Sequence, residues 1–147
     1  MSKIYAFIII IPVIAILLFK AIAFYEFDTK QRYIKNTIDT VAHKVMLTGV
    51  LTAQDKEDMM EKLNRFGNFN EDNVILESGS INADGEVYGM RRYTTGDILD
   101  RGEIFSIVVK SDNESLLSGM EGDSDEDNKL CYKAKAVCRV EKKQFRE

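Results

Sequence analysis

The sequence has little cysteine, histidine or proline. It contains two Cys, one His and one Pro among 147 residues. Two Cys and one His are too few soft ligands for a zinc site closed by Cys and His side chains. A single Pro, with 45% hydrophobic and 30% charged residues, is typical of a globular chain and not of a disordered or collagen-like one. Because no catalytic motif is present, we predict no enzymatic activity and no cofactor.

Basic charge is also scarce. Lys and Arg number 20 against 24 Asp and Glu, so the net charge is −4. A chain without a basic excess is not expected to have a face that neutralises phosphates, which argues against nucleic acid as the main partner. The length allows a single domain.

The apolar residues are concentrated at the N-terminus. Residues 4–19 form a run of 16 without a charge. At a rise of about 1.5 Å per residue this run covers roughly 24 Å, whereas a hydrocarbon core is about 30 Å thick. The span is therefore expected to continue past Lys20, whose ammonium can snorkel to the interface, to about Tyr25. We predict that residues 1–25 are a transmembrane anchor in contact with membrane lipid.

Two other interpretations of this run remain open. In a cleaved signal peptide, Lys3 would be a minimal n-region and residues 21–23 (Ala-Ile-Ala) the cleavage site. The helical pattern continues through Lys20, directly upstream of that site, which favours a retained anchor. The remaining interpretation is an apolar helix buried in a protein core.

Apolar residues continue at helical spacing after the anchor, which predicts an amphipathic helical rod over residues 26–48 that is continuous with it. The stripe packs either on the protein's own sheet or on other subunits. Four strands of about six residues make a sheet roughly 20 Å long, whereas the helix beyond Tyr25 runs about 35 Å. We therefore expect the part of the stripe nearest the membrane to pack against partner helices through Phe24, Phe27, Ile34, Ile38 and Val41.

A second helix and a sheet are predicted after the rod. Gly49 ends the rod, and Thr52 and Asp55 form a capping box that begins a helix over residues 52–66, closed by Gly67. Strands are expected over residues 74–81, 86–93, 103–110 and 130–140, with an Asp84-Gly85 turn after the first. Residues 103–110 are apolar on both faces and should be a central strand. The fold class is thus α+β, with a mainly antiparallel sheet of about four strands over residues 74–140 in a domain of residues 26–147.

Residues 111–128 contain seven acids and no Lys or Arg, which predicts a solvated loop. Asp123, Asp125 and Asp127 resemble the first half of a calcium loop. However, Asn128 and Ala134 occupy the places of its Gly and its bidentate Glu. We therefore favour the solvated loop and predict no metal site.

Cys131 and Cys138 are seven residues apart, so in one straight strand they face opposite sides, too far apart for a disulfide. A bridge would need a tight hairpin between them, and separate thiols are the favoured interpretation. His43, the only possible imidazole partner, lies on the predicted rod and is interpreted as a surface or packing residue.

A hydrophobic rod that continues into an amphipathic helix and precedes a small sheet is the layout of type IV pilin-like proteins. The segment VAHKVMLTGVLTAQDKEDMMEKLNRFGNFNEDNVILESG resembles the minor pseudopilins of tight-adherence (Tad) pili, and RGEIFSIVVK resembles their central strand. For a prepilin peptidase, such proteins usually carry a Gly or Ala before the hydrophobic run, with Glu and Tyr soon after that Gly or Ala. Here no acid precedes Glu26, which argues against processing by a prepilin peptidase.

The resemblance implies a single-pass protein of a bacterial cell membrane, with its C-terminal domain outside the cytoplasm. Basic residues counted on either side of the span favour the opposite orientation, and the family topology decides between the two. The expected function is that of a minor pseudopilin-like subunit of a Tad-like pilus or secretion apparatus. Its partners would be other pilin-like subunits or assembly-platform membrane proteins. The alternative is a stand-alone anchored or secreted binding module.

Overall fold

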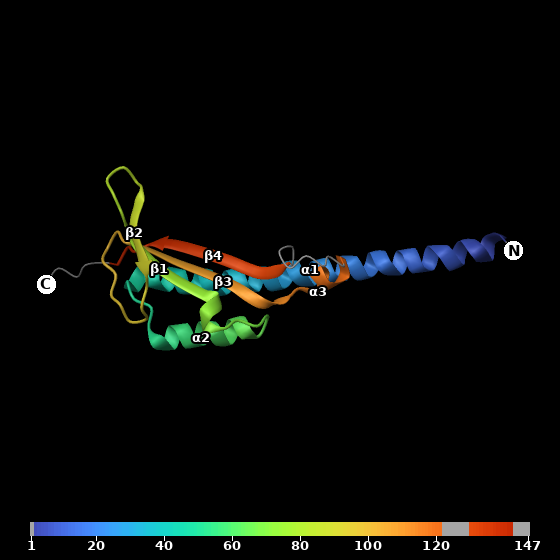
Figure 1. Ribbon diagram of the computed structural model, residues 1–147, viewed down its shortest axis with the longest axis horizontal. Coiled ribbons are helices and arrows are strands. Elements are labelled where there is room, and N and C mark those ends of the chain that lie inside the picture. Colours follow the sequence, from blue (N-terminus) through green and yellow to red (C-terminus); the bar gives the residue numbers. More distant parts are fainter. Residues whose placement is uncertain (1, 122–129, 143–147) are drawn as a thin grey trace.

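The computed structural model describes residues 2–121 and 130–142, arranged around one long helix (Figure 1). The elements in chain order are α1 (Ser2–Thr48), α2 (Ala53–Asn64), the 3₁₀ helix η1 (Glu71–Asn73), β1 (Val74–Ile81), β2 (Val87–Arg92), β3 (Ile104–Glu114), α3 (Leu116–Glu121) and β4 (Cys131–Arg139). Helix α1 continues through Pro12 without interruption. It ends at Gly49, whose φ of 75° lies in the left-handed region that glycine adopts without strain.

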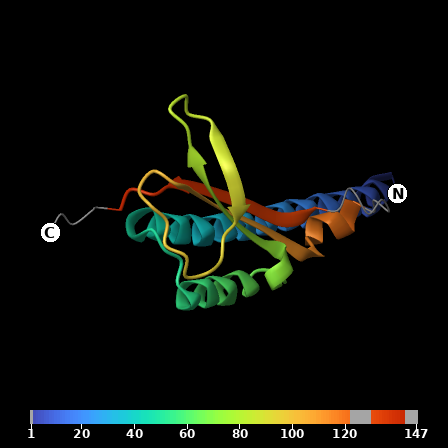
Figure 2. The ribbon, with the colours of Figure 1, turned by 60° about the vertical axis from the view of Figure 1, so that its left-hand side comes forward.

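The four strands form one antiparallel sheet in the order β2-β1-β3-β4. The predicted α+β fold, with a long apolar helix, a shorter helix and a four-stranded antiparallel sheet, is confirmed. Strand β3 lies inside the sheet, as its apolar residues on both faces predict. Helices α1 and α2 pack on one face of the sheet, and the β1–β2 hairpin projects away from α1 on the other side (Figures 1 and 2).

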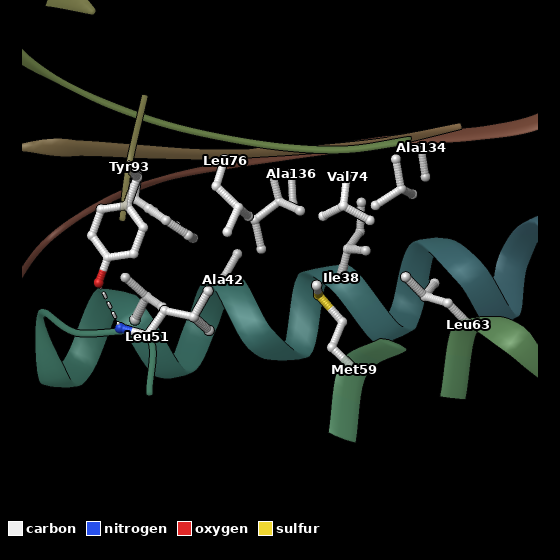
Figure 3. Packing of buried hydrophobic residues seen from close by; sticks show 14 of the residues in the cluster. Ile38, Ala42, Leu51, Met59, Leu63, Val74, Leu76, Tyr93, Ala134 and Ala136 are labelled. Carbon is white, nitrogen blue, oxygen red and sulfur yellow. Dashed lines mark hydrogen bonds between the residues drawn. The ribbon is translucent and has the colours of Figure 1, made fainter. Parts of the chain in front are cut away.

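A single hydrophobic core fills the space between the helices and the sheet (Figure 3). Leu76, Ile107 and Ala136 lie opposite one another on adjacent strands and face this core. Small side chains on α1 and β4 let the helix approach the strand closely, and Met59 and Leu63 close the core from α2. The fully buried side chains of the core are Ile34, Ile38, Val45, Leu51, Met59, Leu63, Phe69, Leu99, Phe105, Ile107, Val109 and Val140.

A buried tyrosine joins the α1–α2 connection to the loop after β2. The Tyr93 hydroxyl accepts a hydrogen bond from the Leu51 N–H (2.9 Å) and donates one to the Asp97 carbonyl (2.6 Å) (Figure 3). Its ring packs edge-on against Phe105 at 5.0 Å between centroids. Burial raises the pKa of Tyr93, so its hydroxyl stays protonated and can donate.

The predicted capping box of α2 is confirmed, but its predicted C-terminal cap is wrong. The Thr52 hydroxyl accepts from the Asp55 N–H (3.1 Å), and the Asp55 carboxylate accepts from the Thr52 N–H (3.4 Å). The helix ends at Asn64 with Arg65, in a right-handed conformation, as its cap. At Gly67 the Phe69 ring instead packs close to the backbone. A Cβ atom at this position would lie 2.8 Å from the ring, which explains why a glycine is found here.

The predicted loop over residues 111–128 is wrong for its first part. β3 continues to Glu114, and α3 follows it. The strand tolerates these polar residues because Asp112 accepts hydrogen bonds from the Asn70 and Asn73 amides at 2.5 and 2.6 Å. Ser111 is buried, and its hydroxyl donates to the Asn113 carbonyl (2.8 Å). Residues 122–128, with the acids considered as a calcium loop, lie outside the described residues.

The packing of α1 predicts a sharp contrast between two of its positions. Ile34→Ala should lower the free energy of unfolding by about 2–4 kcal/mol, because it opens a cavity in a site that is fully buried. Leu47→Ala on the same helix should change it by less than about 0.5 kcal/mol, since that side chain is 55% exposed. Denaturant unfolding of the full chain in detergent measures both values, and equal effects would contradict the assignment of Ile34 to the core.

Candidate functional site

The N-terminal half of α1 is a bare apolar surface. All side chains of residues 3–22 are exposed except the partly exposed Ala15. Most of them are large and aliphatic or aromatic, and Figure 1 shows this half of the helix extending beyond the folded domain. Helix α1 is therefore long and apolar enough to cross a membrane, as its length and composition indicate. This exposed segment is a candidate for a functional surface.

Lys3 and Lys20 are the charged residues of this segment, and the charged residues that follow it on α1 begin with two ion pairs. Glu26 and Lys30 form an ion pair at 2.5 Å, and Asp28 and Arg32 form one at 3.0 Å, each four residues apart on the helix. The Glu26 carboxylate raises the pKa of Lys30, and the Lys30 ammonium lies 6.0 Å from the centre of the Tyr132 ring. Each exposed pair contributes only about 0.3–0.5 kcal/mol to stability, so its larger effect is to neutralise charge beside the apolar segment.

The predicted partner-helix stripe is corrected by the structure. Ile34 and Ile38 are completely buried in the protein's own core, so they are not available to another helix. Phe27 is partly buried and stacks on Tyr132 at 5.4 Å, and Val41 also packs against the core. Only Phe24, which is 62% exposed, remains open to a partner, and contact there stays a prediction.

The correction has a simple cause, which is the length of the strands. The estimate of sheet length used about six residues per strand, which is shorter than the strands predicted over residues 103–110 and 130–140. β3 has 11 residues and β4 has nine, so the sheet follows α1 farther toward its exposed apolar half than that estimate allowed. Helix α3 also packs on α1, and Ala23 is the only buried residue of residues 3–33. A serine before two leucines, at residues 115–117, was the available sequence signal for this short helix.

The edge of the sheet next to α1 is covered by side chains of that helix. Gln31 donates to the Lys133 carbonyl and accepts from the Lys133 N–H (3.3 Å). The Lys35 ammonium donates to the Lys135 carbonyl at 2.8 Å. Since these bonds use backbone groups that a further strand would need, this part of β4 is protected against pairing with another chain.

The face of α1 beside α2 is polar. A shallow groove between the two helices is lined mainly by Asn, Thr, Asp and Lys side chains. Tyr33 stacks on Phe66 beside it with 5.0 Å between ring centres, and Lys44 pairs with Asp55 across the two helices. The Lys44 ammonium lowers the pKa of Asp55, and the Thr52 hydroxyl adds to this effect. This face offers little to an apolar partner.

The described residues show no cluster suited to metal binding. Among residues 2–121 and 130–142, no three His, Cys, Asp or Glu side chains lie close enough together to hold an ion. His43 is exposed on α1, as the surface interpretation predicts.

The two cysteines lie on one continuous strand as free thiols, as predicted. Cys138 lies opposite Phe105 and packs against the core, and burial raises the pKa of its thiol from 9.0 to about 11. Very little of this thiol is ionised at neutral pH. Because only a thiolate is a good nucleophile, Cys138 is poorly suited to covalent catalysis.

Alkylation rates test this environment. In a Cys131→Ser background, Cys138 should react with iodoacetamide about tenfold slower than a cysteine at the neighbouring exposed position, introduced as Val137→Cys in a chain without its native cysteines. Mass spectrometry measures both rates in the folded full chain, and they should become equal in denaturant. Equal rates in the folded state would contradict the burial of Cys138. In the native chain, two cysteines that stay unreactive in denaturant without reductant would show a disulfide.

Comparison of the chain with protein-family models, with curated proteins and with solved structures finds no match. The likeness to Tad pseudopilins therefore consists of layout and local sequence pattern, and it stays a prediction. The two features available for a functional argument are the exposed apolar half of α1 and the folded domain built on its other half.

Proposed function

We propose that this chain is a non-enzymatic structural subunit, a minor pseudopilin-like component of a Tad-like pilus or secretion apparatus. It would be anchored in a bacterial membrane by the first half of α1, with its C-terminal domain outside the cytoplasm. The observation that carries the proposal is that anchor and domain share one uninterrupted helix, bare over residues 3–22 and buried under a sheet over its second half.

An apolar helix of this length requires an apolar environment. Residues 4–23 cover about 30 Å at 1.5 Å per residue, which matches the hydrocarbon core of a bilayer. The same surface can pack against similar helices, which is how subunits with this layout would assemble. Because Ile34 and Ile38 are buried in the core, the surface left for a neighbouring helix is the exposed run with Phe24 and Tyr25 at its end. The proposed partners are other pilin-like subunits or assembly-platform membrane proteins.

One observation favours the alternative of a stand-alone binding module. The face of the sheet opposite α1 has exposed basic residues on β4, namely Lys133, Lys135 and Arg139, around the half-exposed Val137. A basic surface with an apolar centre suits an acidic protein partner in a chain whose net charge is otherwise negative.

Association with other rods distinguishes the two functions. Phe24→Asp should abolish crosslinking to other apolar-helix subunits in the native membrane, because it places a charge on the surface proposed for contact. Its melting temperature should stay within a few degrees of the parent, since the side chain is 62% exposed. Tyr88→Asp on the exposed strand β2 is the matched control and should leave both properties unchanged. Membrane extraction at high pH confirms that each variant is still anchored. If the parent chain itself crosslinks to no other apolar-helix subunit, the binding module is the better description.

Topology is tested by external protease on intact cells, followed by intact-mass measurement. We expect the domain to be accessible from outside and the residues before Phe24 to be retained in the mature chain. Protection of the domain would place it in the cytoplasm. A mature chain that starts at Phe24 would show that the N-terminal segment is a cleaved signal peptide.

A further inference from the structure

Helix α3 lies at the end of the folded domain that is nearest to the exposed half of α1. Figures 1 and 2 both show it beside α1 where the bare helix leaves the domain. It packs on α1. Ala23 is buried although its neighbours Ile22 and Phe24 are exposed, which indicates that this contact lies near Ala23. The short helix therefore marks the level on α1 at which the apolar segment meets the domain.

The length of the apolar segment places this level at the membrane surface. If residues 4–23 cross the hydrocarbon core, Ala23 lies at its boundary. If Lys20 marks the boundary instead, Ala23 lies only about 5 Å beyond it at 1.5 Å per residue. The headgroup layer is about 5–8 Å thick on each side of the core, and a helix is about 10 Å wide. In either case α3 cannot avoid the headgroup layer.

The side chains at this level suit that layer. Leu116 on α3 is 61% exposed, and Leu130 at the start of β4 is 39% exposed. Phe24 and Tyr25 are exposed at the same level of α1, and aromatic rings favour the membrane interface. The nearest charges on α1 after this level, Glu26 and Asp28, are paired with Lys30 and Arg32.

Hydrogen bonds hold α3 in place relative to the sheet. The Ser115 N–H donates to the Leu130 carbonyl at 2.9 Å, and the Leu130 N–H donates to the Ser118 hydroxyl at 3.2 Å. The buried Ser115 accepts from the Ser118 N–H at 3.3 Å. The two leucines are therefore presented by a braced structure and not by a free loop.

We propose that α3 and the start of β4 form an interfacial foot. In this foot, Leu116 and Leu130 insert between lipid headgroups at the boundary of the hydrocarbon core next to the domain, and they set the depth and rotation of the domain on the membrane. This inference rests on the proposed anchoring of α1, and it does not depend on which side of the membrane the domain occupies. The partner of Leu116 and Leu130 is lipid, because their surface continues the lipid-facing surface of α1 beyond Ala23.

Tryptophan fluorescence can test the foot directly, because the chain contains no Trp. The full chain is reconstituted in phosphatidylcholine vesicles with a nitroxide either on the headgroup or near the middle of the acyl chain. Leu116→Trp and, independently, Leu130→Trp place the reporter on the foot. Ile11→Trp reports on the anchor, and Leu47→Trp reports on the far end of α1; both positions are exposed. Far-UV circular dichroism confirms that each variant is folded.

Headgroup nitroxides should quench Leu116→Trp and Leu130→Trp more strongly than acyl-chain nitroxides do. Acyl-chain nitroxides should quench Ile11→Trp most, and Leu47→Trp should be unaffected by both. If Ile11→Trp is quenched but neither foot variant is, the proposed insertion of the foot is wrong, whereas the proposed membrane anchoring is supported. If Ile11→Trp is not quenched, the anchoring itself fails. Equal quenching of Leu47→Trp and Leu116→Trp would show a domain lying flat on the membrane and would also overturn the foot.

Discussion

The structure depends on one constraint, which is that a single helix serves two different environments. Residues 3–22 of α1 are apolar except for Lys3 and Lys20 and are exposed almost throughout, as suits contact with lipid. The second half is apolar along one stripe only, and this stripe is covered by the sheet, with Ile34, Ile38 and Val45 fully buried. The sheet cannot bury its inner face without this half of α1, so the exposed apolar segment and one side of the domain core belong to the same helix.

The remaining elements complete the burial that α1 begins. β4 lies along α1, and its alanines allow close approach, while Gln31 and Lys35 bond its free backbone groups. Helix α2 closes the core from the side, and its capping box is linked to α1 by the Lys44–Asp55 ion pair. These polar contacts are exposed and individually weak, so the energy comes from apolar burial and the polar contacts fix its geometry.

Local sequence signals predicted much of this architecture. The uninterrupted apolar run, Gly49, the Thr52–Asp55 capping box and the Asp84-Gly85 turn each act through residues close in the chain, and the structure contains all of these features. The errors involve contacts between distant segments. The polar end of β3 is a strand because Asn70 and Asn73 bond to Asp112 about 40 residues away, which no local pattern encodes.

The error in the predicted partner-helix stripe of α1 has the same origin, because it also involves contacts between distant segments. Periodicity correctly placed Phe27, Ile34, Ile38 and Val41 on one stripe of α1, but it could not tell which protein covers that stripe. The answer depended on strand length, and strand length in turn depended on non-local hydrogen bonds. Helix α3 escaped prediction because its two leucines lie in a segment dominated by acids, although the helix lies where the bare part of α1 leaves the domain.

The unbroken path of α1 across Ala23 also has a mechanical consequence. No glycine or loop separates the exposed apolar segment from the domain. In a chain anchored by that segment, as proposed, α1 would transmit a tilt of the anchor directly to the domain. The 25 residues beyond Ala23 form an arm of about 38 Å, so a tilt of about 10° in the membrane moves the far end by roughly 6–7 Å. The tip of the β1–β2 hairpin, near that end, would be displaced with it. The position of the outermost surface of the protein would thus depend on the thickness of the lipid around its anchor.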